Sequence, residues 1–166
     1  MNIEQPSKTN PKSCLGCRMA FTRAVLKELN KTTLAAGGFE QKTLSHLKLV
    51  QATPGMVKFN LTVEKGDSNI YDTMHGGLGA SLVDLCSSVA ILSKCKRWGV
   101  STDMQVSYLK GAPVGKDITI VGQCDRAGKT LAFSSCFIYN EKGDLLLKGQ
   151  HTKFMGTPLV ELELDD

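Results

Sequence analysis

The sequence predicts an α+β domain in which an antiparallel sheet of five or six strands packs against one long apolar helix. The helix is predicted from apolar residues that recur every three or four positions from Leu78 to Leu92. A strand is predicted over 56–64, where every second side chain is apolar, after a Pro54-Gly55 turn. Strand-like runs also occupy 100–109, 117–124, 130–139 and 144–154. Turn-forming residues at 127–128 and 140–143 favour successive antiparallel hairpins.

Residues before the first predicted strand divide into a polar extension and a short helix. Residues 1–17 include Pro6 and Pro11, and we expect a disordered extension there. Over 18–31 the spacing predicts an amphipathic helix whose apolar side is formed by Phe21, Val25, Leu26 and Leu29. We therefore expect a single domain over 18–156, followed by an acidic tail at 157–166.

The long helix carries a carboxylate where its surroundings are otherwise apolar. Its apolar residues leave only a narrow stripe, formed by Gly77, Ser81, Asp84 and Ser88. A stripe this thin indicates a helix that is covered on most sides, so we expect Asp84 to be largely buried. A buried carboxylate costs free energy unless it is hydrogen-bonded or protonated, which makes Asp84 a candidate active-site acid. The stripe is equally compatible with a hydrated seam between subunits.

The same helix begins at a His75-Gly76-Gly77 turn. The first N–H groups of a helix have no acceptor inside the helix, and the helix dipole favours an oxygen that carries negative charge there. The turn is therefore a candidate oxyanion site for a substrate carbonyl. The alternative is that the glycines allow a tight turn or close packing and that His75 caps the helix.

Gly76 and Asp84 are too far apart in one helix to act on the same substrate. Eight residues at about 1.5 Å per residue separate them by roughly 12 Å. A reacting carbon, by contrast, needs both groups within about 3 Å. If both residues act, each site combines the turn of one chain with Asp84 of another, and activity requires a dimer.

Several motifs, taken in order, make the sequence resemble the hotdog-fold acyl-coenzyme A thioesterases. They are Asn69, the His75-Gly76-Gly77 turn, Asp84, and the segments 99–104 and 128–133. The likeness runs from about Leu47 to Gly156. It implies a hotdog fold, which is a sheet wrapped around a long central helix, with an N-terminal helix packed on the domain. It also implies edge-to-edge dimers and their stacking into a homotetramer.

The resemblance further implies a role for each residue of the site. Asp84 matches the nucleophile or the general base that activates water, and Ser101 matches a hydroxyl that holds this water. His75 and the Gly76 N–H match the groups that polarise the thioester carbonyl. Asn69 matches an amide that orients the attacking group or the carbonyl, although an asparagine here is also an ordinary loop former. Asn69, His75 and Gly76 would come from one subunit, and Asp84 and Ser101 from the other.

The chain departs from the pattern of its relatives at two positions near the site. Relatives often have glycine where this chain has Asp72, and some have a polar residue where it has Leu85. Asp72 would act on Asp84 by like-charge repulsion if it faced the site, whereas pointing into solvent would leave it without effect. Neither departure removes a group that the resemblance implies to be catalytic.

Coenzyme A carries phosphates, so basic residues near the site are expected to bind it. The resemblance places Lys129, His151 and Lys153 near the nucleotide end of the substrate, and the basic segment 94–97 is a second candidate cluster. Each of these residues is also compatible with an ordinary solvated position. Coenzyme A is part of the substrate, and we expect no separate cofactor and no metal.

Composition excludes several other classes of protein. The chain has 166 residues, of which 42% are hydrophobic, enough for one sizeable core. A net charge of +4 from scattered basic residues, with 6% aromatic residues, does not indicate a nucleic-acid partner. We expect no membrane span. The N-terminal segment lacks the apolar core of a secretory signal, and Glu4 and Glu28 argue against a mitochondrial leader, so a cytoplasmic location is expected and a mitochondrial one is the alternative.

Six cysteines raise the question of disulfides or zinc. Cys14 and Cys17 form a single C-x-x-C, with no second pair and no histidine at metal-ligand spacing. Reduced thiols are therefore expected, and a redox-sensitive Cys14/Cys17 pair is the alternative.

Three functions from different classes follow from these observations. The leading one is hydrolysis of a fatty or aryl acyl-coenzyme A to the free acid and coenzyme A. The second is an acyl-thioester hydratase or dehydratase, which would add or remove water without releasing thiol. The third is a non-catalytic acyl-coenzyme A binding module, which would bind the thioester without turnover.

Overall fold

The computed structural model describes residues 15–31 and 37–156 of the chain. In this part of the chain the elements are α1 (Leu15–Leu29), α2 (Phe39–Leu44), β1 (Lys48–Thr53), β2 (Met56–Thr62), a 3₁₀ turn (Lys65–Asp67), α3 (Gly76–Cys95), β3 (Val100–Tyr108), β4 (Asp117–Ala127), β5 (Leu131–Asn140) and β6 (Leu145–Phe154). The predicted α+β class and the predicted long helix are confirmed. The acidic tail and most of the predicted N-terminal extension lie outside the described residues. Residues 15–17, assigned to that extension, belong to α1 instead.

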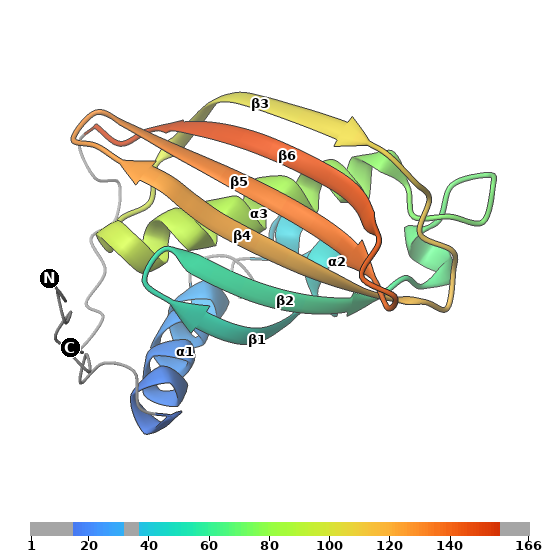
Figure 1. The fold of residues 1–166 in the computed structure, drawn as a ribbon, viewed down its shortest axis with the longest axis horizontal. Helices are drawn as coiled ribbons and strands as arrows, with labels where there is room; N and C mark the ends of the chain where they lie inside the picture. The colour runs from blue at the N-terminus through green and yellow to red at the C-terminus, as the bar shows by residue number, and fades with distance from the viewer. Residues whose placement is uncertain (1–14, 32–36, 157–166) are drawn as a thin grey trace, which may run out of the picture.

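The six strands form one antiparallel sheet in the order β1-β2-β4-β5-β6-β3 (Figure 1). The hairpins predicted at 127–128 and 140–143 are present, since β4 pairs with β5 and β5 pairs with β6. The prediction of successive hairpins is wrong for β3, which pairs with β6 rather than with β4. The 20 residues of α3 extend about 30 Å and carry the chain across the sheet to its opposite edge before β3 begins.

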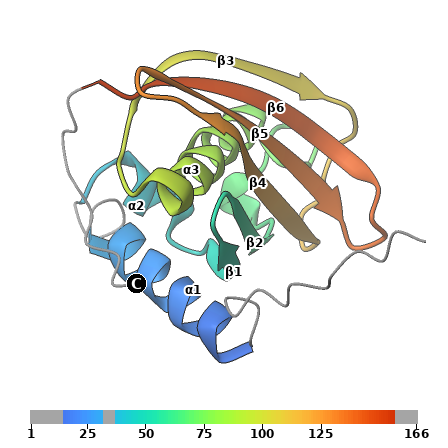
Figure 2. The same cartoon turned by 60° about the vertical axis from the view of Figure 1, so that its left-hand side comes forward.

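The core lies between the inner face of the sheet and α3. Buried and exposed residues alternate along β2, with Val57, Phe59 and Leu61 pointing inward, as the sequence predicted. Glycines let α3 lie close to the strands, because a Cβ atom at Gly122 would collide with the Cys86 carbonyl oxygen and one at Gly149 with the Val83 side chain. Figure 2 shows the sheet curling around α3, with α1 and α2 on the side that the sheet leaves open.

Two elements on this open side were not predicted. The helix α2 has six residues, too few for a reliable helical period, and β1 lacks a clean alternation of buried and exposed residues. α1 covers the outer edge of β1, where the Ala52 N–H donates a hydrogen bond of 3.0 Å to Thr22 Oγ1. Val25 and Leu29 of α1 are buried as predicted, but Leu26 is exposed.

The other edge of the sheet is formed by β3, which pairs with β6 alone among the described strands. Seven of its nine residues are exposed and the other two are half-buried. An uncovered edge of this length presents a row of backbone N–H and C=O groups to another strand. It is therefore the edge at which a further strand can be added.

By length and composition alone, α3 is apolar enough to cross a membrane. In the folded chain, however, 72% of this apolar stretch of α3 is buried inside the domain. This degree of burial is that of a core helix.

Candidate active site

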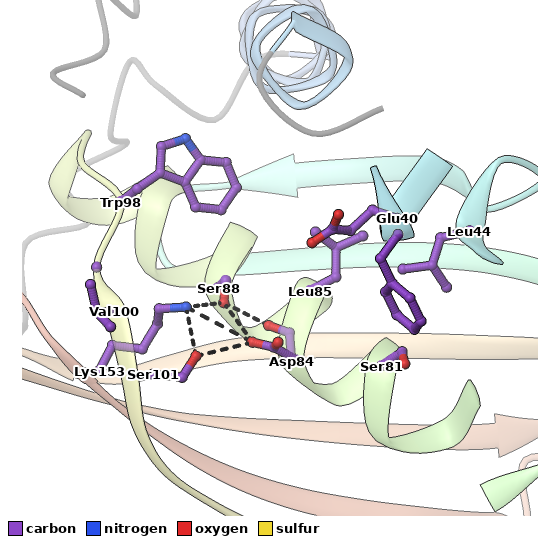
Figure 3. A pocket seen from close by; sticks show the side chains of 12 residues that line it. Glu40, Leu44, Ser81, Asp84, Leu85, Ser88, Trp98, Val100, Ser101 and Lys153 are labelled. Carbon is purple, nitrogen blue, oxygen red and sulfur yellow. Dashed lines mark hydrogen bonds and ion pairs between the residues drawn. The ribbon is translucent and has the colours of Figure 1, made fainter. Parts of the chain in front are cut away.

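Asp84 lies near the middle of α3 and opens into a cavity of about 360 Å³ (Figure 3). Its side chain is 52% exposed, so the expectation of a largely buried carboxylate is wrong for the single chain. The sheet covers only one side of α3, and the stripe containing Ser81 and Asp84 faces the space between α2 and the start of β3. The cavity is lined by Phe39, Glu40, Leu44, Ser81, Asp84, Leu85, Ser88, Trp98, Gly99, Val100, Ser101 and Lys153.

One oxygen of this carboxylate, Oδ1, is surrounded by polar groups. Ser101 Oγ lies 3.4 Å and Ser88 Oγ 3.5 Å from Oδ1. His151 Nε2 lies 3.7 Å and Lys153 Nζ 3.9 Å from the same oxygen. We call these five residues the acid cluster. Within the described residues no hydrogen bond or ion pair reaches the other oxygen, Oδ2, so one carboxylate oxygen is anchored while the other is left for a ligand.

His151 and Lys153 do not lie where the sequence placed them. Both were expected to bind coenzyme A phosphates, but the His151 side chain is 0% exposed and the Lys153 side chain 8% exposed. Their strand position explains this, because alternate residues of β6 point inward and these two lie beneath Asp84. In the single chain the His151 ring is enclosed and Lys153 reaches only the cavity at Asp84, so neither lies on an open surface where a phosphate contact was expected.

Burial also changes the proton affinity of both groups. Burial, followed by the neighbouring Lys153 ammonium, lowers the pKa of His151, against the opposing effect of the Asp84 and Asp103 carboxylates. Burial lowers the pKa of Lys153, and Asp84 acts in the opposite direction. Ser87 Oγ lies 2.7 Å from His151 Nδ1, whereas the buried Nε2 has no hydrogen-bond partner in the part of the chain described.

The N-terminus of α3 forms a second group of candidate residues, which we call the glycine turn (residues 69–77). His75 is the N-cap of α3, and the Gly77 N–H donates a hydrogen bond of 2.9 Å to His75 Nδ1. The cap predicted as the alternative role of His75 is thus present. Because Nδ1 accepts, a neutral His75 carries its proton on Nε2, and the ring is exposed. The capping role therefore leaves a ring N–H donor available to a ligand.

The Gly76 N–H is one of the first N–H groups of α3, for which the helix itself supplies no acceptor. On its other side, the Gly76 carbonyl oxygen accepts a hydrogen bond of 2.9 Å from the Tyr108 hydroxyl at the end of β3. Tyr108 was not predicted as part of the site, and a single tyrosine at the end of a strand gives no signal for such a contact. Backbone hydrogen bonds also hold the turn from outside its own segment, from the Met74 N–H to the Ala112 carbonyl oxygen at 2.7 Å and from the Val114 N–H to the Asp72 carbonyl oxygen at 3.1 Å.

Asn69 organises the loop that leads to α3. Its Oδ1 accepts hydrogen bonds from the Tyr71 N–H at 2.9 Å and the Thr73 N–H at 3.3 Å, as in an ordinary loop-forming asparagine. Asp72 adopts a φ of 54°, in the left-handed region that glycine enters without strain. Its carboxylate is exposed and pairs with Lys65, so it points into solvent rather than toward Asp84.

Within one chain, the two groups of residues open into different cavities. Asn69, Gly76 and Tyr108 line a hollow of about 380 Å³ that shares no residue with the cavity at Asp84. Asp84 and Ser101, by contrast, are brought together as expected. The structure therefore joins one predicted half of the site and keeps the other half apart from it, in agreement with the separation of roughly 12 Å expected along the helix.

The remaining candidates lie away from both cavities. Lys129 is exposed in the turn between β4 and β5. Arg97 donates a hydrogen bond of 3.4 Å to the Gly128 carbonyl oxygen in the same turn. No group of three or more potential metal-ligating side chains is found in the described part of the chain.

Four cysteines within the described ranges are free thiols, namely Cys86, Cys95, Cys124 and Cys136. Burial raises the pKa of Cys86 and raises that of Cys136 to about 12, so neither forms a reactive thiolate at neutral pH. Cys14 and the side chain of Cys17 lie outside what the structure describes.

Sequence reasoning missed one residue for which a signal existed. Ser88 belongs to the narrow polar stripe of α3, four residues after Asp84, and its hydroxyl donates to the Asp84 carbonyl oxygen at 2.6 Å. Lys153 was named, but for a different role. Nothing in the sequence places β6 beneath Asp84, because that contact spans 65 residues between Ser88 and Lys153.

An antiparallel sheet curled around one long helix, with an anchored carboxylate that faces a cavity, defines the hotdog class of thioester-processing proteins. The family model described as the thioesterase superfamily matches residues 71–147. Acyl-coenzyme A thioesterase 13 from Homo sapiens is 41% identical over 133 residues, covering 79% of this chain and 94% of the relative. The solved structure of thioesterase superfamily member 2 from zebra fish matches with a TM-score of 0.74 at 36% identity, covering 79% of this chain and 96% of that one.

The chain belongs to the thioesterase superfamily. The corresponding mouse structure of thioesterase superfamily member 2 gives a TM-score of 0.71 at 36% identity, covering 78% of this chain and 96% of that one. The hotdog fold and the predicted enzyme class, a thioester hydrolase, are thereby confirmed.

Proposed function

We propose that this chain hydrolyses acyl-coenzyme A thioesters, with medium- or long-chain fatty acyl or aryl acyl groups, to the free acid and coenzyme A. The observation that carries the proposal is the asymmetric environment of Asp84 in the cavity, where four neighbouring side chains contact Oδ1 and none of the described residues binds Oδ2. The identity of 41% to a relative named acyl-coenzyme A thioesterase 13 supports this choice of thioester.

Asp84 acts as a general base or as a nucleophile. As a base, it accepts a proton from water while the water oxygen bonds to the thioester carbon, and the C–S bond then breaks to release coenzyme A as the thiol. As a nucleophile, Oδ2 displaces the thiol and forms an anhydride, which water hydrolyses. Either route develops negative charge on the carbonyl oxygen, which the Gly76 N–H and the His75 ring N–H stabilise. Ser101 holds the attacking water, and Asn69 keeps the glycine turn in place.

The complete site is formed by two chains. This proposal is supported by the separate cavities of the acid cluster and the glycine turn, and by the uncovered edge of β3. Pairing of two β3 strands joins the two sheets and covers both exposed edges. In such a dimer the glycine turn of one protomer binds the carbonyl of the substrate that Asp84 of its partner attacks. Two such dimers form a homotetramer.

Lys129 remains the residue proposed to bind the phosphates of coenzyme A, since it is exposed in the β4–β5 turn. No separate cofactor takes part in this reaction scheme, because water and the thioester are the only reactants. We assign the reaction to the cytoplasm, and a mitochondrial location is the alternative.

The decisive experiment measures thiol release from a panel of acyl-coenzyme A substrates by the wild type, Asp84→Asn and Asp84→Ala. We expect kcat to fall by about 10²- to 10⁴-fold in both variants, as for loss of a general base, with the fold and oligomer retained. Glu40→Gln, which removes a carboxylate from the same cavity, is the matched control and should remain active. Water addition to an enoyl thioester without thiol release would identify a hydratase instead, and tight binding without turnover would identify a binding module.

A further inference from the structure

Lys153 is the most deeply buried charged group of the acid cluster, and its ammonium has three partners. Nζ lies 2.8 Å from Ser88 Oγ and 3.2 Å from Ser101 Oγ, and both are hydrogen bonds that the lysine donates. The third partner is Asp84 Oδ1, at 3.9 Å. Two of the three N–H donors of the ammonium thus form hydrogen bonds, and Asp84 forms an ion pair with its charge. Figure 3 shows these contacts converging from β6, β3 and α3.

The lysine fixes the direction of the hydrogen bonds around it. Because Ser101 Oγ accepts from Lys153, its own proton is free to be donated, and Asp84 Oδ1 lies 3.4 Å away. Ser88 Oγ likewise accepts from Lys153 and donates its proton to the Asp84 carbonyl oxygen at 2.6 Å, which is much closer than Oδ1 at 3.5 Å. In both chains of hydrogen bonds, Lys153 donates to a serine hydroxyl and that hydroxyl donates to Asp84.

We propose that Lys153 is a positioning residue for hydrolysis: it holds Asp84 through Ser101, whose hydroxyl reaches Oδ1, and through Ser88, whose hydroxyl binds the Asp84 carbonyl oxygen, so that the carboxylate keeps one orientation at the cavity. This inference rests on the proposed thioesterase function and adds a residue to it. Lys153 lines the edge of the cavity, and its side chain is only 8% exposed because its ammonium points at Ser88, Ser101 and Asp84. Burial of an ammonium is costly unless it is paired, and the three partners supply that pairing.

Several charged groups surround Asp84 and bear on its pH dependence. Lys153 and His151 face it from β6, Asp103 of β3 acts on His151, and Glu40 lines the same cavity from α2. Burial and Lys153 both lower the pKa of His151 and thus favour its neutral form near pH 7. Lys153 is therefore the cation that compensates Asp84 at neutral pH.

The experiment compares kcat, KM and the pH dependence of kcat for the wild type, Lys153→Met, Lys153→Arg and Lys148→Met. Lys148 lies on the same strand but is exposed on the outer face of the sheet, so Lys148→Met is the matched control. For Lys153→Met we expect kcat to fall by about 10- to 100-fold with KM unchanged, as for loss of charge-assisted hydrogen bonds. The acid limb of the profile should move to higher pH, because the cation that favours the charged carboxylate is absent. Lys153→Arg keeps the charge and should restore the acid limb.

A double-mutant cycle separates positioning from a purely structural effect. If Lys153 acts through Ser88, the losses in kcat of Ser88→Ala and Lys153→Met should be less than additive when combined. Additive losses, or a Lys153→Met profile that matches that of Lys148→Met, would overturn the inference. If Lys153→Met does not fold, Ser88→Ala alone must lower kcat and move the acid limb in the same direction, and an unchanged profile would refute the role. Absence of thiol release by the wild type would instead refute the proposed function itself.

Discussion

The glycine turn and the acid cluster lie on the same helix but are built in different ways. The side-chain hydrogen bonds of the turn are mainly local, since Asn69 contacts residues two and four positions away and His75 contacts Gly77. In the acid cluster, Ser101 meets Asp84 across 17 residues and Lys153 meets Ser88 across 65. The side chains of the turn are thus arranged mainly by its own sequence, while its backbone is also held by the segment 108–114. The acid cluster exists only when the whole sheet has formed.

This difference decides what each region can do alone. The glycine turn presents donors but contains no base, whereas the acid cluster presents a base and directs its serine and lysine donors at Asp84 and at one another rather than at a developing oxyanion. Neither half is complete for hydrolysis, and their cavities do not share a residue. A site split in this manner makes assembly of the protomers a condition of activity, which is the feature that mixing experiments test most directly.

The largest expected effect is recovery of activity when two inactive variants are mixed. Gly76→Pro removes the N–H donor at the first helical position, where proline is tolerated, and His75 has the extended backbone (φ −62°, ψ 136°) that proline favours before it. Asp84→Asn removes the base. Refolded together, the two chains should form mixed dimers with one intact site in two, which gives about a quarter of wild-type activity after random pairing. The measurement is thiol release against mixing ratio.

Comparison with Gly76→Ala, which keeps the N–H, separates loss of the donor from filling of space, because a Cβ at this position meets the Tyr108 ring at 3.5 Å, an ordinary contact. No recovery in mixtures that demonstrably contain mixed dimers would show that each chain holds a complete site. The glycine turn and the acid cluster would then lie in separate cavities without needing to come from different chains for catalysis.

A smaller effect is expected at His75, where the capping and the catalytic roles can be separated. His75→Ala should lower the free energy of unfolding by about 1 kcal/mol through loss of the cap, and Tm by about 3 °C. Thermal denaturation measures this loss, and His75→Asn should reverse it, because asparagine is a good cap. If the ring N–H polarises the thioester carbonyl, both variants should lose kcat alike. Full activity in His75→Asn would leave only the cap as the function of His75.

The same contrast explains how much the sequence could predict. Periodicity predicted α3 and β2 to β6, and turn residues predicted two of the hairpins, because these features depend on neighbours in the chain. The position of β3 at the edge next to β6 was not predictable in this way, because it depends on how α3 packs across the sheet and on where its C-terminus lies. The cap at His75 and the loop at Asn69 were foreseen as alternatives.

The acid cluster could be predicted only in part. Asp84 was conspicuous because it interrupts an apolar helix, and Ser101 came from the resemblance alone. His151 and Lys153 were taken for phosphate ligands because basic residues on a strand give no sign of which face they occupy until the register of β6 against β3 and β5 is known. Distant contacts of this kind have no local sequence signal.

The smallest expected effect concerns His151, which only long-range packing buries. Its pKa is lowered in the folded chain, so as the pH falls below about 6.5 the unfolded chain binds a proton that the folded chain resists. The stability contributed by neutral His151 is therefore present above this pH and is lost as the pH falls toward the lowered pKa. Between pH 6.5 and 5.5, Tm of the wild type should fall by about 1 to 2 °C more than that of His151→Gln, which does not titrate and can still bond Ser87. Equal slopes of Tm against pH would show that the buried ring is protonated as readily as in the unfolded chain.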